Sequence, residues 1–217
     1  MATFLVFELI ALIFSVMIHE IAHGYVAERL GDDTARRAGR LTLNPIKHID
    51  IFGSIVLPFI LLLSNVGIIL GWAKPVPYNP SNLSKDYKNG PLKVALAGPL
   101  SNVLILIVLG LVARFGANYL SPTAIGLLGF VGYLNIFLAV FNLVPIPPLD
   151  GSKILPYIFP KINLISVERF GVTGIIIVFL FIYLFSGVLA GIASAIFSLV
   201  AGQQVVDTMN SVLQSFF

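Results

Sequence analysis

Long stretches without charged residues alternate along the chain with short polar segments. Residues 94–113, 115–149 and 170–206 contain no Asp, Glu, Lys or Arg. Each reaches or exceeds the roughly 20 residues that a helix needs to cross the hydrocarbon core of a bilayer. The apolar N-terminus has no basic segment before it and no small-residue cleavage site, so we expect a retained first helix. The pattern predicts an all-α protein that crosses the membrane several times.

Four segments are predicted to form the spans. We expect membrane-crossing helices at about 3–29, 92–114, 124–144 and 166–187. The tail at 188–216 carries a few polar residues and fits an interfacial helix, a partial re-entry or a fifth span. No internal repeat or low-complexity linker divides the chain, so we expect one membrane domain.

The composition narrows the class of protein. Hydrophobic residues make up 58% of the 217 positions and charged residues only 11%, whereas a soluble domain is about half apolar and about a quarter charged. These values exclude an ordinary soluble globule, a disordered chain and a nucleic-acid-binding protein. The chain has no cysteine, so any bound metal must be ligated by His, Asp or Glu.

The placement of the basic residues predicts the topology. All of them except Arg114 lie in 29–47, 74–93 and 153–169, which the positive-inside rule assigns to the cytoplasm. The apolar stretch 51–70 is flanked by two of these segments, so it cannot cross the membrane once and still satisfy the rule. Because Pro and Gly interrupt it, we expect a re-entrant or broken segment there. A plain span that violates the charge rule is the alternative.

Two histidines and a glutamate lie where the first helix should be embedded in the membrane. His19, Glu20 and His23 form an H-E-x-x-H pattern, which places both histidines on one helix face and the glutamate within reach of a metal-bound water. Ionisable groups at this depth are costly and usually functional. A rise of 1.5 Å per residue puts His19 about 24 Å below residue 3, in the cytoplasmic third of the membrane. A structural pair of histidines between helices is the alternative.

A catalytic zinc site of this kind needs a third protein ligand and an open position for water. The candidates are Glu28, His48, Asp50 and Asp150. Glu28 should face away from the histidines, because five residues turn a helix by about 140°. Asp150 is better placed, since it lies near the end of segment 142–151, whose three prolines prevent a regular helix. Irregular backbone at membrane depth must be buried or line a water-filled cavity.

These motifs together resemble one known family. The segments that carry the likeness are HEIAHGYVAERLGD at 19–32, LNPIKHID at 43–50, GWAKPVPYNP at 71–80, AGPLSN at 97–102 and FNLVPIPPLDG at 141–151. The chain resembles the site-2 protease family of intramembrane zinc metalloproteases, and most of all its small prokaryotic members without PDZ or CBS domains.

The resemblance implies a single transmembrane metalloprotease domain over residues 1–217, with a core at 3–160 and C-terminal membrane segments at 166–216. The expected fold is all-α and polytopic, with about four to five transmembrane helices. A re-entrant or broken segment should lie near the active site, with room for short β-strands.

The resemblance also assigns roles to individual residues. His19, His23 and Asp150 are expected to ligate one Zn2+ per chain, and Glu20 is expected to act as general base and general acid. The zinc would activate a water molecule and polarise a peptide carbonyl.

Residues outside the ligand set carry weaker expectations. Asn142 matches a family asparagine associated with substrate binding near the zinc. Pro75, Val76 and Pro77 belong to a region expected beside the active site, where an extended edge could hold an unwound substrate. His48 is expected either to bond a ligand histidine from the second shell or to cap its own loop.

The function expected from these observations is hydrolysis of peptide bonds within or near transmembrane segments of membrane proteins. The partners are then transmembrane protein or peptide substrates and the lipid bilayer, with no nucleic acid. We expect a multi-pass protein of the cell membrane with its active site towards the cytoplasm. Two alternatives are a divalent-metal transporter, which should spread polar groups across the membrane depth, and an inactive homologue that binds transmembrane helices. The sequence identifies neither the substrate nor the oligomeric state.

Overall fold

The computed structural model describes residues 2–56, 59–60, 73–159 and 171–216. The chain forms two compact units, one made of Leu9–Val94 and the other of the chain on either side of it. The described residues contain helices and loops but no strand, which confirms the predicted all-α class.

Four long helices match the predicted spans. They are α1 (Ala2–Arg29), α4 (Gly90–Phe115), α5 (Pro122–Asn142) and α8 (Gly171–Ala201). Each is long and apolar enough to cross a membrane, so the prediction of a polytopic protein is confirmed. Between and after them lie shorter elements: α2 (Thr34–Arg37), η1 (Pro45–His48), η2 (Ile51–Val56), η3 (Pro80–Asn82), η4 (Asp150–Ile154), α6 (Leu155–Ile158) and α9 (Gln203–Gln214). Most of the stretch 51–70, predicted to re-enter, lies outside the described residues.

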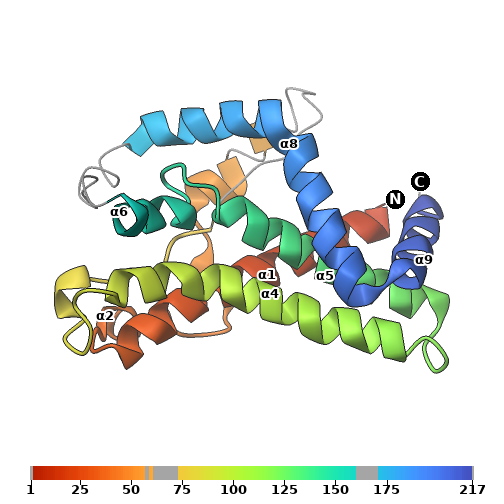
Figure 1. Cartoon of the computed structure of the whole chain (residues 1–217), viewed down its shortest axis with the longest axis horizontal. Helices are drawn as coiled ribbons and strands as arrows, with labels where there is room; N and C mark the ends of the chain where they lie inside the picture. The colour runs from red at the N-terminus through yellow and green to blue at the C-terminus, as the bar shows by residue number, and fades with distance from the viewer. Residues whose placement is uncertain (1, 57–58, 61–72, 160–170, 217) are drawn as a thin grey trace. The chain divides into compact units, whose positions relative to one another are not determined.

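The C-terminal tail does not form a separate fifth membrane-crossing helix in the described structure. Helix α8 continues to Ala201, past its expected end at 187, because the chain stays apolar until Gly202 ends the helix with a φ of +83°. Helix α9 has only 12 residues, well short of a membrane crossing, and it packs against α5 within the same unit (Figure 1). It is amphipathic, with Val205 and Met209 buried and Asp207 exposed.

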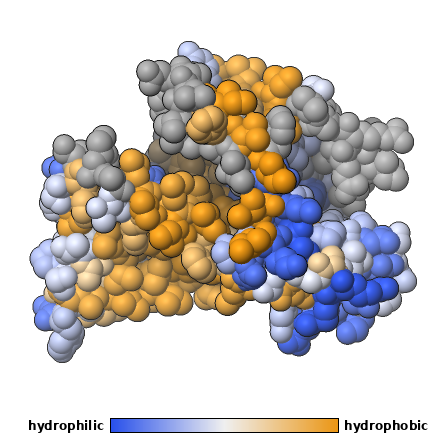
Figure 2. Space-filling model, turned by 180° about the vertical axis from the view of Figure 1, so that it is seen from behind, coloured by the Kyte–Doolittle hydropathy of each residue, from blue (hydrophilic) through white to orange (hydrophobic). Residues whose placement is uncertain are grey.

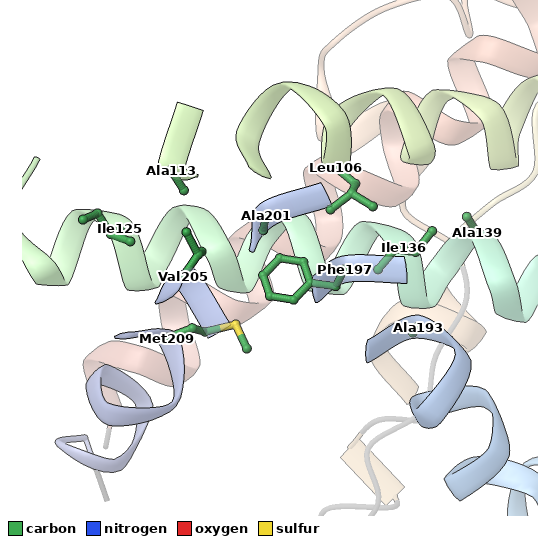
Figure 3. Close-up of a cluster of buried hydrophobic side chains, with 10 residues drawn as sticks. All are labelled: Leu106, Ala113, Ile125, Ile136, Ala139, Ala193, Phe197, Ala201, Val205 and Met209. Atoms are coloured by element: carbon green, nitrogen blue, oxygen red, sulfur yellow. The ribbon is translucent and has the colours of Figure 1, made fainter. Parts of the chain in front are cut away.

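The main hydrophobic core of the larger unit is shared by α4, α5, α8 and α9 (Figure 3), and a smaller cluster of Val144, Leu149 and Leu189 lies in the same unit. Phe197 of α8 lies at its centre and is only 1% exposed. Glycines bring the helices close: a Cβ at Gly126 of α5 would lie 2.7 Å from the Cβ of Val212 on α9. A buried amide pair also joins α4 to α5, because Asn102 Nδ2 donates to Asn135 Oδ1 at 2.8 Å.

The smaller unit wraps loops around the second half of α1. An extended segment, 73–79, runs beside this helix, and a Cβ at Gly24 would lie 2.7 Å from Cγ1 of Val76. Only a glycine therefore allows this close approach, one residue after His23. A small core of Ala27, Leu83 and Val94 fixes the loops that follow.

The surface separates by polarity. Exposed apolar side chains cover the long helices, among them Leu100, Leu104 and Val108 of α4. Hydrophilic residues gather instead over α2 and the loops beside it, at the lower right of Figure 2. A protein in a bilayer requires apolar helix surfaces towards the lipid and polar loops towards the water.

Candidate metal centre and active site

Helix α1 presents two buried histidines one turn apart. His19 and His23 are 5% and 7% exposed, and their Nε2 atoms lie 3.0 Å apart. Nδ1 of His23 lies 2.6 Å from the main-chain oxygen of Val94. A carbonyl can only accept, so Nδ1 carries the proton and, in the neutral ring, Nε2 keeps its lone pair. This is the tautomer that a metal-ligating histidine needs, with one nitrogen available to ligate and the other held by a hydrogen-bond acceptor.

The histidine pair fits a zinc ion. Two Zn–N bonds of about 2.0–2.1 Å at a tetrahedral angle place their nitrogens about 3.3 Å apart, close to the 3.0 Å between the two Nε2 atoms. The imidazole donors suit zinc, and their burial shields the position from bulk water.

Glu20 lies against the extended segment that the sequence predicts to be near the active site. The backbone N–H of Val76 donates to Oε2 of Glu20 at 2.8 Å, across 56 residues of sequence. The structure therefore brings together, within one unit, the predicted general base and the segment Pro75–Pro77. Both neighbours of Val76 are prolines, which have no N–H, so this residue supplies the only backbone donor of the three.

Asp150 and Asn142 belong to the other unit. Asp150 is buried at the start of η4, and Nζ of Lys153 donates to its Oδ1 at 3.1 Å. The chain folds tightly before it, because a Cβ at Gly151 would lie 2.2 Å from the Leu143 carbonyl oxygen. Asn142 ends α5 and donates from Nδ2 to the Leu138 carbonyl at 2.9 Å.

His48 is buried in the loop after α2. Its Nε2 lies 2.9 Å from the Thr42 carbonyl oxygen, and its own carbonyl accepts the N–H of Lys74 at 2.9 Å. Arg40, also buried, donates to the Lys74 carbonyl. In the described structure these contacts make His48 part of the scaffold that holds segment 73–79.

Sequence reasoning missed two groups that contact the candidate site residues. The Val94 carbonyl that bonds His23 is a main-chain atom, so no side chain in the sequence marks it. Lys153 was recognisable only as a basic residue three positions after Asp150, a spacing that allows contact on a helical turn.

Long apolar helices, one of which carries buried histidines and a glutamate in zinc-ligand spacing, define the class of membrane-embedded zinc hydrolases. The comparisons with known proteins name the family. The model described as "Peptidase family M50" matches residues 110–186, a stretch that includes α5 and Asp150. No solved structure matches the chain.

Three curated relatives extend this match over most of the chain. "Putative zinc metalloprotease YwhC" of Bacillus subtilis is 39% identical over 180 residues, which are 78% of this chain and 78% of that protein. "Putative zinc metalloprotease MJ0611" of Methanocaldococcus jannaschii is 33% identical over 73% of this chain and 75% of its own length. "Zinc metalloprotease MJ0392" of the same organism is 30% identical over 70% of this chain, but the match spans only 34% of that longer protein.

The chain belongs to peptidase family M50, the site-2 protease family. It is a zinc metalloendopeptidase and a multi-pass membrane protein.

Proposed function

We propose that this enzyme cuts peptide bonds within or near the membrane-spanning segments of other membrane proteins. The observation that carries the proposal is the position of the histidine pair and Glu20 on α1, a helix long and apolar enough to cross the membrane. A soluble substrate would have no access to groups at this depth. The three basic segments further support a cell-membrane protein whose active site faces the cytoplasm.

His19, His23 and Asp150 are the proposed ligands of one zinc ion. The Nε2 atoms of both histidines have the separation that such a site needs. Asp150 supplies the third ligand in this proposal because it is a buried carboxylate in an irregular segment, and the chain has no cysteine to take its place. A carboxylate can bond Lys153 through one oxygen and ligate through the other. One metalloprotease domain then comprises both halves of the chain.

Glu20 is the proposed proton carrier. Bound zinc supplies a Lewis acid that lowers the pKa of water and polarises a peptide carbonyl. Glu20 takes the proton from the attacking water and delivers it to the nitrogen of the leaving amine, so one carboxylate acts first as base and then as acid. The N–H of Val76 orients this carboxylate without neutralising it.

The substrate must unwind before it is cut, because the carbonyls of an intact transmembrane helix are already bonded within the helix. Segment Pro75–Pro77 is a suitable edge for the unwound strand. Both prolines offer carbonyl acceptors and no donors, and Val76 N–H is committed to Glu20. We therefore expect the substrate to donate its own N–H groups to this edge. In this proposal the amide of Asn142 binds a substrate main-chain group near the zinc.

The test is cleavage of a panel of single-span substrates by purified enzyme in detergent, comparing the wild type with Glu20→Gln and measuring zinc in both. Glutamine keeps an oxygen that accepts the Val76 N–H but cannot carry the proton. We expect cutting by the wild type alone, with about one zinc in each protein. Cleavage by the glutamine variant, or folded wild-type protein without zinc, would contradict these roles.

A further inference from the structure

Asp32 is a fully buried carboxylate that the proposed reaction does not use. It follows α1 by three residues and is 0% exposed. Oδ2 accepts the N–H of Asn79 at 2.6 Å, while Oδ1 accepts Nδ2 of Asn82 at 3.0 Å and the N–H of Thr34 at 3.2 Å. The hydroxyl of Thr34 donates to Oδ1 as well. A buried charge is tolerated only where such bonds replace its hydration.

These bonds join the end of the helix that carries the histidines to the end of the extended segment. Val76, which holds Glu20, lies three residues before Asn79. Between them Pro77 fixes its own φ, and Pro80 restricts the conformation of Asn79. A stiff segment that is fixed at Asn79 therefore has little freedom left at Val76.

The turn between α1 and Asp32 is built for this contact. Gly31 has a φ of +114°, and a Cβ there would lie 2.5 Å from Oγ of Ser84 and 3.1 Å from the Asn82 carbonyl oxygen. A side chain at this position would both strain the backbone and push the 82–84 loop away. The glycine allows Asp32 to follow the helix end directly and to lie under the loop.

We propose that Asp32 is a positioning residue that, by bonding Asn79 and Asn82, holds segment 76–82 in the register that brings the Val76 N–H to Glu20. The inference rests on the proposed role of Glu20 and adds a residue that acts on it from outside the site. Asp32 contacts neither the histidines nor Glu20 through any bond described here, so its effect must pass through the segment. Removal of the Asp32 carboxylate should make segment Pro75–Pro77, which is proposed to bind the substrate, more mobile. The Glu20 side chain should then be less well oriented.

The informative substitution is Asp32→Asn, and its matched control is Asp33→Asn. Asparagine has nearly the same shape, but it turns one acceptor into a donor that faces the donors of the loop. The control substitution removes the same charge one residue away, at an exposed side chain that pairs with Arg37. The fold should survive in both variants, because Leu83 stays buried and the Lys85 N–H still bonds the Leu30 carbonyl at 3.1 Å.

Two measurements decide the proposal. Hydrogen exchange of peptides covering 73–82 should be faster in Asp32→Asn than in the wild type and unchanged in Asp33→Asn. In the cleavage assay kcat/KM should fall about tenfold to a hundredfold, with a raised KM and about one zinc per chain retained. A lower folded fraction would reduce kcat alone and leave KM unchanged.

Each result has a definite meaning. Unchanged exchange in Asp32→Asn, equal acceleration in the control, or an unchanged KM would overturn the positioning role. Hydrogen exchange needs no substrate. A failure of the wild type to cleave would therefore count against the proposed function and not against the claim that Asp32 holds segment 76–82. If Asp32→Asn does not fold, Asn82→Ala removes one of the bonds, and exchange at wild-type rates in that variant would also overturn the proposal.

Discussion

Main-chain atoms orient the side chains of the site. The Val94 carbonyl fixes the tautomer of His23, and the Val76 N–H holds Glu20. A substitution at Val94 or Val76 leaves these main-chain atoms present. The orientation of His23 and Glu20 therefore depends on the path of the backbone and not on the side chains of Val94 and Val76. At this scale the residues to vary are the side chains proposed to ligate the metal and those that hold the backbone.

Asp150→Asn tests the proposed third ligand. An amide is a much poorer zinc ligand than a carboxylate, so zinc affinity should fall by about tenfold or more, with loss of cleavage. Zinc content of purified protein, titrated against a chelator, is the measurement. Asp207→Asn on α9, where the side chain bonds Gln203 on the surface, is the matched control and should keep its zinc. Equal affinity in the two variants would remove Asp150 from the ligand set.

The stability contributed by Asp32 should depend on pH. Burial raises the pKa of this carboxyl, but the hydrogen bonds from Thr34, Asn79 and Asn82 outweigh it, so the pKa lies below the ordinary 3.8. The unfolded chain then binds the proton first as the pH falls. The stabilising contribution is complete above pH 3.8 and is lost as the pH drops through the lower folded pKa.

Unfolding of the wild type and Asp32→Asn in detergent, followed from neutral pH to below pH 3.8, measures this contribution. The difference in free energy of unfolding between the two should be largest at neutral pH and should shrink in acid. A difference that stays constant, or that grows in acid, would show that the carboxylate is not stabilised by these bonds.

At the scale of the elements, hydropathy predicted α1, α4 and α5 to within about two residues, because their ends coincide with polar residues, prolines or turns. It failed for the end of α8, where the chain stays apolar for 14 residues past the expected end at 187 until Gly202 ends the helix. The packing of α9 on α5 was not predictable. It depends on glycines of α5, about 80 residues earlier in the chain, and the spacing of these glycines does not indicate which helix packs against them.

The contact between α5 and α9 can be tested with one methyl group. Gly126→Ala places a Cβ 2.7 Å from Val212, so α9 must shift, at a cost of about 1–3 kcal/mol. Gly191→Ala in α8 is the control, because a Cβ there meets no atom within 4 Å in the described structure. The melting temperature in detergent should fall for the first variant and not for the second. Equal melting temperatures would argue against close packing of α9 on α5.

For the whole molecule, the spacing H-E-x-x-H predicted the histidine pair because both histidines lie on one helix turn. The bonds from Val76 to Glu20 and from Asn79 to Asp32 span 56 and 47 residues. No local sequence pattern encodes hydrogen-bond partners so distant. The hydropathy of residues 73–82 also does not distinguish a segment held by such bonds from a solvated loop. The H-E-x-x-H motif was therefore predictable, and the scaffold that orients Glu20 was not.

The proposed topology places the loop between α4 and α5 outside the cell and the basic loops inside. The chain has no cysteine, so single cysteines report accessibility without background. Tyr119→Cys, at a side chain 90% exposed in that loop, should react with a membrane-impermeant maleimide on intact cells. Arg37→Cys, at an exposed side chain at the end of α2, should react only after the cells are opened. The reverse labelling pattern would invert the topology and place the active site towards the outside.

The most direct test of the account is the position of the cut. Purified enzyme and a single-span substrate are reconstituted together in lipid vesicles, and the products are mapped by mass spectrometry beside a Glu20→Gln reaction. The account predicts a cut within or next to the apolar segment of the substrate, made by the wild type alone. Cuts confined to the soluble flanks, or identical products from the glutamine variant, would contradict an intramembrane zinc protease that uses Glu20.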